Sequence, residues 1–175
     1  MGNLYYVANI RRLPTEKAFG GQTMHVCESF VRAGETVTLV LPRGPRSGTQ
    51  INPFEYYGIK IPFKIIKLPC VDFLAFDNLV KWIKFPIFYP LQELTFSISA
   101  FFWALFNRKV KVIYARQAIP ALFLSFVPKL QVYFEVHELA QSRLGKWIFR
   151  ILGMRTRGII TLVDEQKNSL IVMGS

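Results

Sequence analysis

Two neighbouring glycines stand where a phosphate could bind. Gly20-Gly21 follow a short apolar segment and precede a segment with helical spacing, so we expect them in a strand-to-helix turn. Without Cβ atoms, their backbone N–H groups could approach an anion, and the dipole of the following helix would favour its charge. The other interpretation is that the pair only shapes a tight turn. Neither G-x-G-x-x-G nor G-x-x-x-x-G-K-[ST] is present, which argues against nicotinamide cofactors and nucleotide hydrolysis.

Arg116, His137 and Glu138 are the second group of candidates, because they directly follow predicted strands. Arg116 could hold a phosphate of a substrate, or it could pair with a carboxylate on the next loop. A histidine after a strand is, by itself, more often structural or exposed. His25 is expected on the solvated side of a helix.

Other common catalytic groupings are missing from the sequence. No serine stands in a recognisable motif with either histidine, so hydrolase chemistry has no positive signal. The histidines and acidic residues lack a metal-ligand spacing such as H-E-x-x-H. We therefore expect no tightly bound metal.

The elements that would position these residues alternate between strand and helix. Short runs rich in β formers predict about six parallel strands, and segments with helical spacing separate them. Right-handed crossovers between such strands give a single domain, residues 1–175, with a Rossmann-like, doubly wound α/β sheet. The strands are expected at 3–9, 35–41, 63–68, 111–115, 130–136 and 158–163, and the helices after Gly21 and near 91–106, 118–127, 142–153 and 165–173.

The edge of this sheet where the strands end is the expected binding site. In doubly wound sheets, ligands bind beyond the carboxyl ends of the strands. Gly20, Gly21, Arg116 and His137 would all project there, so the site would be assembled from loops far apart in the sequence.

Two stretches of the sequence resemble glycosyltransferase family 4. Residues 12–30 followed by 34–42 are similar to the opening of that family, with a glycine-containing loop, a helix and a second strand. Residues 112–117 and 132–138 are similar to its "vYtRs" and "vyevHd" strands. Glu35 stands where many members have histidine, outside the expected site.

The resemblance implies a fold and an activity, the N-terminal, acceptor-side half of a GT-B glycosyltransferase. It places His137 near the transferred sugar, where it would hydrogen-bond a sugar hydroxyl. Glu138 stands where many members have aspartate, so the carboxylate is kept with a longer reach. The resemblance also implies a nucleotide-sugar donor as co-substrate, a glycan or lipid-linked acceptor, retention of the anomeric configuration without a protein nucleophile, and no tightly bound cofactor.

The half that binds the donor is expected to be missing from this chain. The predicted helix 165–173 is followed at once by Gly174-Ser175, and a donor domain of this family would carry two glutamates in an E-x7-E pattern. We therefore expect the 175 residues alone to be inactive as a transferase.

The composition favours a folded domain that is attracted to anions. Hydrophobic residues make up 51% of the sequence and aromatic residues 15%, which excludes a disordered or low-complexity chain. Lys and Arg number 22 against 11 Asp and Glu, and the net charge of +11 attracts phosphates of nucleic acids, lipids or substrates. Two cysteines and no evident secretory segment favour the cytoplasm.

The aromatic segment 73–106 suggests contact with a membrane. Its uncharged run 94–106 is shorter than the roughly 20 residues of a spanning helix, and 91–106 is predicted as a helix that covers the sheet. The stretch 73–90 and the basic helix 142–153 suit peripheral binding at the inner face of a membrane, although the latter could be an ordinary solvated helix. The contact residues would be Lys81, Trp82, Lys84, Phe85, Phe88 and Trp147.

A second class of function would use the same fold without catalysis. A basic membrane-associated or nucleic-acid-binding domain would account for the charge. No groove-reading motif or basic and aromatic binding face for nucleic acid is recognisable, so nucleic acid is not an expected partner.

Overall fold

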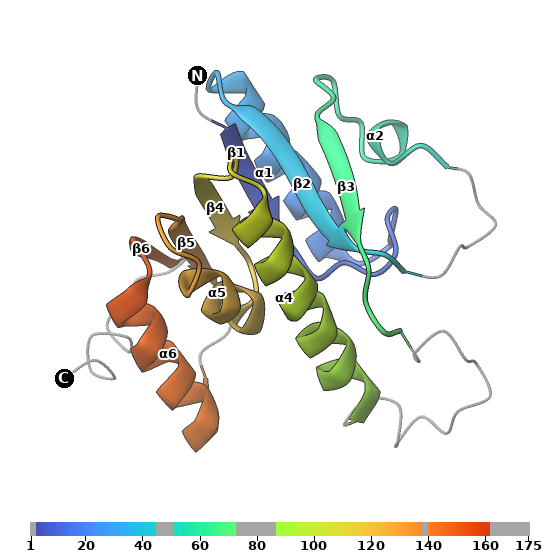
Figure 1. Ribbon diagram of the computed structural model, residues 1–175. Coiled ribbons are helices and arrows are strands. Elements are labelled where there is room, and N and C mark those ends of the chain that lie inside the picture. Colours follow the sequence, from blue (N-terminus) through green and yellow to red (C-terminus); the bar gives the residue numbers. More distant parts are fainter. Residues whose placement is uncertain (1–2, 45–50, 73–86, 138–139, 162–175) are drawn as a thin grey trace.

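The computed structural model describes residues 3–44, 51–72, 87–137 and 140–161. Within them lies a six-stranded sheet whose pairings are all parallel, in the order β3-β2-β1-β4-β5-β6 (Figure 1). This arrangement confirms the predicted Rossmann-like α/β fold. The strands are β1 (Asn3–Val7), β2 (Thr36–Pro42), β3 (Lys64–Leu68), β4 (Val112–Ala115), β5 (Gln131–Val136) and β6 (Gly158–Thr161).

The inner strands are short, largely apolar runs, and most of their residues are buried or half-buried. β2, for example, is buried from Val37 to Pro42 without the alternation of a half-exposed strand. Continuous burial of this kind is typical of parallel strands that helices cover from both sides. Where the structure describes the strand ends, the predicted boundaries differ from them by two residues at most.

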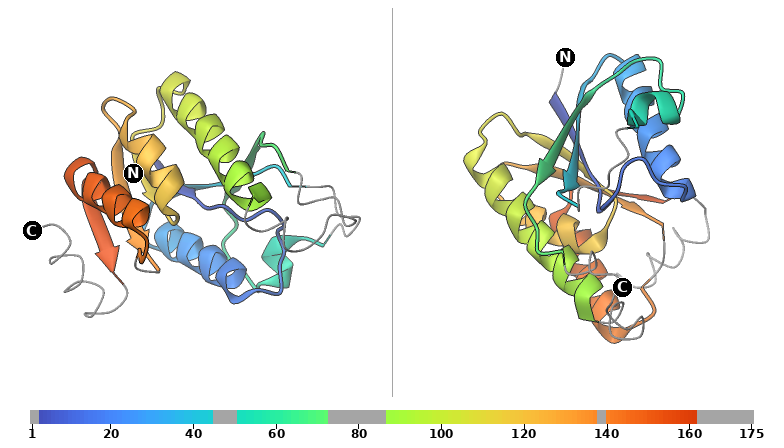
Figure 2. Two further views of the ribbon diagram at one scale, coloured as in Figure 1. Left: turned by 90° about the horizontal axis from the view of Figure 1, so that it is seen from below. Right: turned by 90° about the vertical axis from the view of Figure 1, so that its right-hand side faces the viewer.

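Helices cover the sheet in two layers (Figure 2). Alternate residues of a strand face opposite sides, and they belong to two separate cores. Tyr6 and its stacked neighbour Tyr114 lie in the first core, whereas Val7 and Ala115 lie in the second. The first core packs against α1 (Ala18–Arg32) and α2 (Pro53–Tyr56), and the second packs against α4 (Tyr89–Phe106), α5 (Ala118–Ser125) and α6 (Arg143–Arg155).

The start of α1 differs from the prediction. The helix begins at Ala18, so Gly20 and Gly21 lie in its first turn and not in a loop before it. The short helix α2 was also not predicted. The side chain of Asn52 caps it by accepting a hydrogen bond of 3.0 Å from the amide of Phe54, and Pro53 occupies its first turn.

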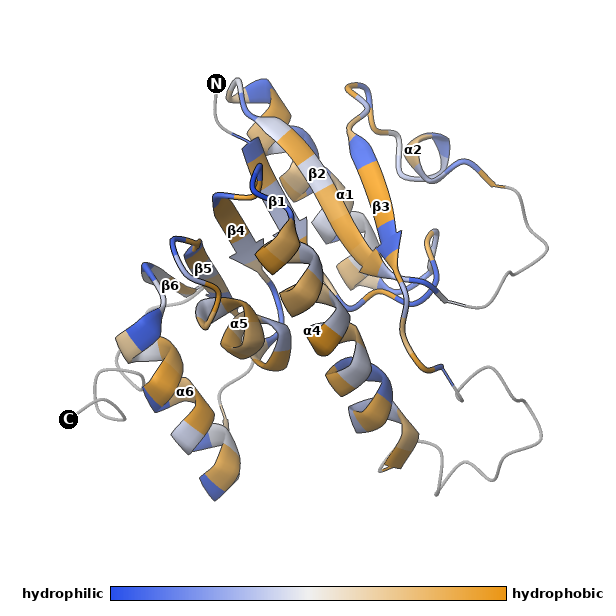
Figure 3. Ribbon diagram, in the orientation of Figure 1, coloured by the Kyte–Doolittle hydropathy of each residue, from blue (hydrophilic) through white to orange (hydrophobic). Residues whose placement is uncertain are grey.

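The helix α4 covers the sheet, which confirms the prediction for residues 91–106. Phe96, Ala100 and Ala104 are buried against the second core, whereas Phe102 on the other side is exposed. Figure 3 shows the mixture of hydropathies along this helix. Among the described residues, no helix combines the length and the apolarity needed to cross a membrane. The predicted helix 165–173 lies outside the described residues.

Candidate functional site

The candidate site lies where the strand order changes direction. From β1 the chain continues to β2 on one side of it, and after β3 it crosses by way of α4 to β4 on the other side. Neighbouring strands whose connections run in opposite directions leave a crevice at their carboxyl ends, which is the usual ligand site of such sheets.

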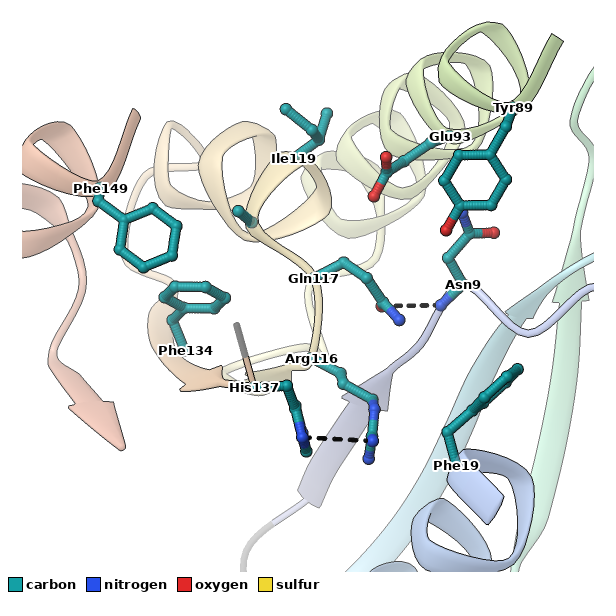
Figure 4. A pocket seen from close by; sticks show the side chains of 11 residues that line it. Asn9, Phe19, Tyr89, Glu93, Arg116, Gln117, Ile119, Phe134, His137 and Phe149 are labelled. Carbon is teal, nitrogen blue, oxygen red and sulfur yellow. Dashed lines mark hydrogen bonds between the residues drawn. The ribbon is translucent and has the colours of Figure 1, made fainter. Parts of the chain in front are cut away.

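A cavity of about 440 Å³ opens at this edge of the sheet (Figure 4). Its walls come from the ends of β1, β4 and β5 and from the helices α1, α4, α5 and α6. Polar and aromatic side chains share the lining, as is usual for sites that bind small molecules. The lining residues are Asn9, Phe19, Tyr89, Glu93, Arg116, Gln117, Ala118, Ile119, Phe134, His137 and Phe149.

Arg116 and His137 meet on the α1 side of the sheet. Arg116 is only 9% exposed. Its Nη2 donates a hydrogen bond of 2.9 Å to Oε1 of Gln22, which lies on α1, and it is 3.4 Å from Nδ1 of His137. The expectation that these two residues project together from neighbouring strands is therefore confirmed, although their roles remain predictions.

A buried carboxylate lies beneath His137. Oε1 of Glu135 is 3.0 Å from Nε2 of His137, and Oε2 accepts a hydrogen bond of 2.9 Å from the hydroxyl of Tyr6. Burial and the nearby charge of Glu135 raise the pKa of Tyr6 well above its ordinary value. The same two causes raise the pKa of Tyr114 to about 12. Both tyrosines are therefore neutral near pH 7.

The α4 side of the cavity is built from amides and one carboxyl group. The backbone N–H of Asn9 donates to Oε1 of Gln117 over 2.9 Å, and Nε2 of Gln92 donates to Oδ1 of Asn9 over the same distance. Burial raises the pKa of Glu93, which lines the cavity from α4. This side of the cavity can thus exchange hydrogen bonds with neutral polar groups of a ligand.

Two buried donor atoms at the cavity have no hydrogen-bond partner among the described residues. These are Nδ2 of Asn9 and Nη1 of Arg116, and both side chains line the cavity. Buried polar atoms are usually paired. Both atoms are buried, so a ligand in the cavity reaches them only when the side chain turns toward it, and the cationic Arg116 suits an anionic group.

Gly20 has a packing role that the sequence did not reveal. Its amide donates to the carbonyl oxygen of Lys17, so it is not presented to an anion. A Cβ atom on Gly20 would collide with Thr15 and lie 2.5 Å from the hydroxyl of Tyr57. That hydroxyl is hydrogen-bonded to both the amide and the carbonyl of Thr15, each over 2.7 Å. The absent side chain of Gly20 therefore lets Tyr57 approach the loop before α1.

The other predicted site residues are distributed as follows. Glu138 and the proposed membrane contacts Lys81, Trp82, Lys84 and Phe85 lie outside the described residues. Phe88 is half-buried at the start of α4, and Trp147 is exposed on α6. Among the described residues, no cluster of three or more His, Cys, Asp or Glu side chains could hold a metal ion.

Several residues of the site were not predicted from the sequence, among them Tyr6, Asn9, Glu93 and Glu135. For two of these residues, Asn9 and Glu135, the position in the sequence already indicated a place in the site. Asn9 stands two residues after the end of β1, at the same edge as Arg116. Glu135 stands two residues before His137, and residues two apart in a strand face the same side. Glu93 had no such signal, because its place depends on how α4 packs.

Comparisons with known proteins show the fold of the chain but not its activity. No protein-family model and no curated protein matches the chain. A solved structure of sucrose-phosphate synthase from Thermosynechococcus elongatus aligns with all of this chain, with a TM-score of 0.67 and 11% sequence identity. The chain spans 46% of the length of that structure. It therefore has the Rossmann-like α/β fold found in part of a GT-B glycosyltransferase.

Proposed function

We propose that residues 1–175 form the acceptor-binding domain of a retaining glycosyltransferase. The observation that carries the proposal is the pairing of Arg116 and His137 in a cavity at the switch point of the sheet. The likeness of the fold to a synthase of a phosphorylated disaccharide supports it. The donor is a nucleotide sugar, which a second domain or partner binds across the cleft, and the chain alone is inactive.

The residues of the cavity have separate roles in this proposal. Arg116 holds an anionic group of the acceptor, since its Nη1 is an unpaired buried donor among the described residues. His137 hydrogen-bonds a hydroxyl of the transferred sugar, and Glu138, which follows it, contacts the acceptor. The positive end of the α1 dipole, with Gly21 in its first turn, faces the donor phosphate, whereas the amide of Gly20 is bonded to Lys17 and takes no part.

The chemistry is a displacement at the anomeric carbon of the donor. The bond from that carbon to the phosphate oxygen breaks, and a bond to the acceptor oxygen forms on the same face of the sugar. The hydroxyl proton of the acceptor passes to the departing phosphate. The protein supplies orientation and charge, and no side chain needs to form a covalent bond with the sugar.

The test is transfer of a radiolabelled sugar by the complete gene product. It is incubated with a panel of nucleotide sugars and with a lipid and glycan extract of the source cells. We expect Arg116→Gln and His137→Ala to lower the rate by about 10- to 100-fold, the range expected from losing a hydrogen bond to a charged group. Arg157→Gln is the matched control, because Arg157 is exposed and precedes β6 at the opposite edge of the sheet.

Two results would overturn the proposal. One is the absence of transfer with every nucleotide sugar while the protein is folded. The other is transfer in which Arg116→Gln and His137→Ala are as active as the Arg157→Gln control.

A second proposal concerns where the domain works. The helix α6 exposes Leu144, Trp147 and Met154, and the basic residues Arg143 and Lys146 are exposed beside them. Figure 3 shows hydrophilic and hydrophobic residues alternating along this helix. Apolar rings beside cations suit the boundary between lipid headgroups and acyl chains. We propose peripheral binding to the cytoplasmic face of an anionic membrane, with a lipid-linked acceptor.

A further inference from the structure

Glu135 is a buried carboxylate that the proposed function leaves unexplained. It is 2% exposed, so it lies beneath the cavity and does not reach a ligand. An isolated charge at such a depth is costly unless polar groups compensate it. Its two oxygens have two different neighbours, the hydroxyl of Tyr6 at 2.9 Å and Nε2 of His137 at 3.0 Å.

Arg116 constrains the other nitrogen of the histidine ring. Its Nη2 lies 3.4 Å from Nδ1 of His137 (Figure 4). A guanidinium group has only donors, so Nδ1 must present a lone pair in this contact. A neutral imidazole with a lone pair on Nδ1 carries its proton on Nε2, which is the atom beside the Glu135 carboxylate. The 3.0 Å contact of Nε2 lacks the angle of a hydrogen bond, so Glu135 favours this tautomer through its charge, and Arg116 favours it through the lone pair that its donor needs.

We infer that Glu135, held by Tyr6, is a positioning residue that fixes the proton of His137 on Nε2. Nδ1 is then the accepting atom that His137 presents beside Arg116 at the cavity. In the reaction, Arg116 turns to the anionic group of the ligand, and Nδ1 accepts a hydrogen bond from a hydroxyl of the transferred sugar, so the proton of the reacting hydroxyl can pass to the departing phosphate. The role of Nδ1 in the reaction rests on the proposed function, whereas the assignment of the proton to Nε2 does not.

Several elements of the described structure bring further ionisable groups to the surroundings of the His137 ring. Tyr6 is on β1, Cys27 on α1, Glu93 on α4, and Tyr114 and Arg116 are on or directly after β4. Burial raises the pKa of the Cys27 thiol, and the charge of Glu135 contributes, so this thiol is neutral near pH 7. Glu138 follows His137 in the sequence. Among the described residues, Arg116 and Glu135 are charged groups in direct contact with the ring, and they have opposite signs.

The sequence offers a direct experiment, because it contains only two histidines. In a ¹⁵N-labelled chain, long-range ¹H–¹⁵N spectra at about pH 8.5, roughly two units above the ordinary histidine midpoint, report which nitrogen carries the proton. We expect the proton of His137 on Nε2. His25, on α1 with its side chain 58% exposed, is the internal reference.

A variant then tests the part played by Glu135. In Glu135→Gln the negative charge beside the ring is gone, so the titration midpoint of His137 should fall by about one pH unit. The midpoint of His25 should not move. The chemical shifts of the remaining amides show whether this variant keeps the native fold.

Three outcomes decide the inference. A proton on Nδ1 in the wild-type chain would overturn it, and this measurement needs no variant. An unmoved His137 midpoint in a folded Glu135→Gln protein would overturn the role of Glu135. If both expectations are met and no sugar transfer occurs, the proposed function fails while the tautomer assignment stands.

Discussion

At the scale of single residues, the two adjacent glycines of α1 have different surroundings. A Cβ atom on Gly20 would collide with Thr15 and with the hydroxyl of Tyr57, which two hydrogen bonds hold in place. A Cβ atom on Gly21 would meet only ring carbons of Tyr57, at 3.5 Å or more, which is ordinary contact. Gly20 is thus required by close packing, whereas Gly21 is not.

We expect opposite effects from the two alanine substitutions. Gly20→Ala should lower the free energy of unfolding by about 1–3 kcal/mol, the usual range for overpacking. Gly21→Ala should leave it unchanged or raise it by up to ~1 kcal/mol, because alanine favours the helix over glycine. Urea unfolding of both variants checks this. Equal effects of the two changes would contradict the packing role of Gly20.

At the scale of elements, Glu28 joins α1 to the segment that leads into β3. Its side chain accepts hydrogen bonds from the amides of Lys60, over 2.8 Å, and Ile61, over 3.1 Å. The guanidinium group of Arg32, one turn further along α1, lies 3.1 Å from the same oxygen. Burial acts to raise the pKa of Glu28, but these contacts lower it below its ordinary value.

The lowered pKa makes this connection sensitive to acid. A carboxyl group whose pKa is lower in the folded state stabilises the protein above its unfolded pKa, and the contribution is lost as the pH falls through the folded pKa. Glu28→Gln should therefore be less stable than the wild type near neutral pH, and the difference should shrink below about pH 4.3. Urea unfolding across the acid range measures it.

Glu16→Gln is the control for this series, because Glu16 is an exposed carboxylate just before the same helix. We expect its unfolding curve to follow the wild type at each pH. A Glu28→Gln protein whose loss of stability stays constant down to the lowest pH would contradict the role given to the charge.

At the scale of the whole molecule, the two helix layers present different surfaces. The layer of α4, α5 and α6 includes the exposed Trp147, which is 58% exposed, with basic residues beside it. The layer of α1 and α2 includes the exposed ring of Tyr56 on α2. With a net charge of +11, the proposed orientation puts α6 against an anionic surface.

Vesicle sedimentation tests that orientation. The chain should bind vesicles that contain phosphatidylglycerol more tightly than vesicles of phosphatidylcholine alone, and salt should weaken the binding. Lys146→Gln should lower the affinity about fivefold, because each basic residue near an anionic surface contributes ~1 kcal/mol to binding. Trp147→Ala should also lower it, whereas Tyr56→Ala, on the other layer, should not. Failure to bind either kind of vesicle would remove the membrane proposal.

Much of the fold was predictable because its signals are local. Apolar runs and prolines marked the strands, and the rule that ligands bind beyond strand ends predicted that Arg116 and His137 lie close together. The prediction of a glycine loop was wrong because helix propensity disfavours Gly20 and Gly21. Packing of Tyr57 against the first turn of α1, from a position far along the sequence, outweighs that preference.

The part of the site that could not be predicted depends on packing between elements. The place of Glu93 follows from the position of α4 over the strand ends, which no spacing in the sequence encodes. Glu135 is different, since the alternation of β5 already put it on the same side as His137. A buried acid two residues before a histidine in a strand is a signal that can be sought in other sequences.

The place of β1 in the sheet has a consequence for synthesis on the ribosome. β1 is made first, pairs with β2 on one side, and meets β4 on the other only about 100 residues later. At roughly 5–20 residues per second, one edge of the nascent β1 remains unpaired for about 5–20 s. An open strand edge invites pairing with other chains. A chaperone acting during translation would therefore be needed most after β2 and before β4 has been made, to keep the open edge of β1 from pairing with other chains.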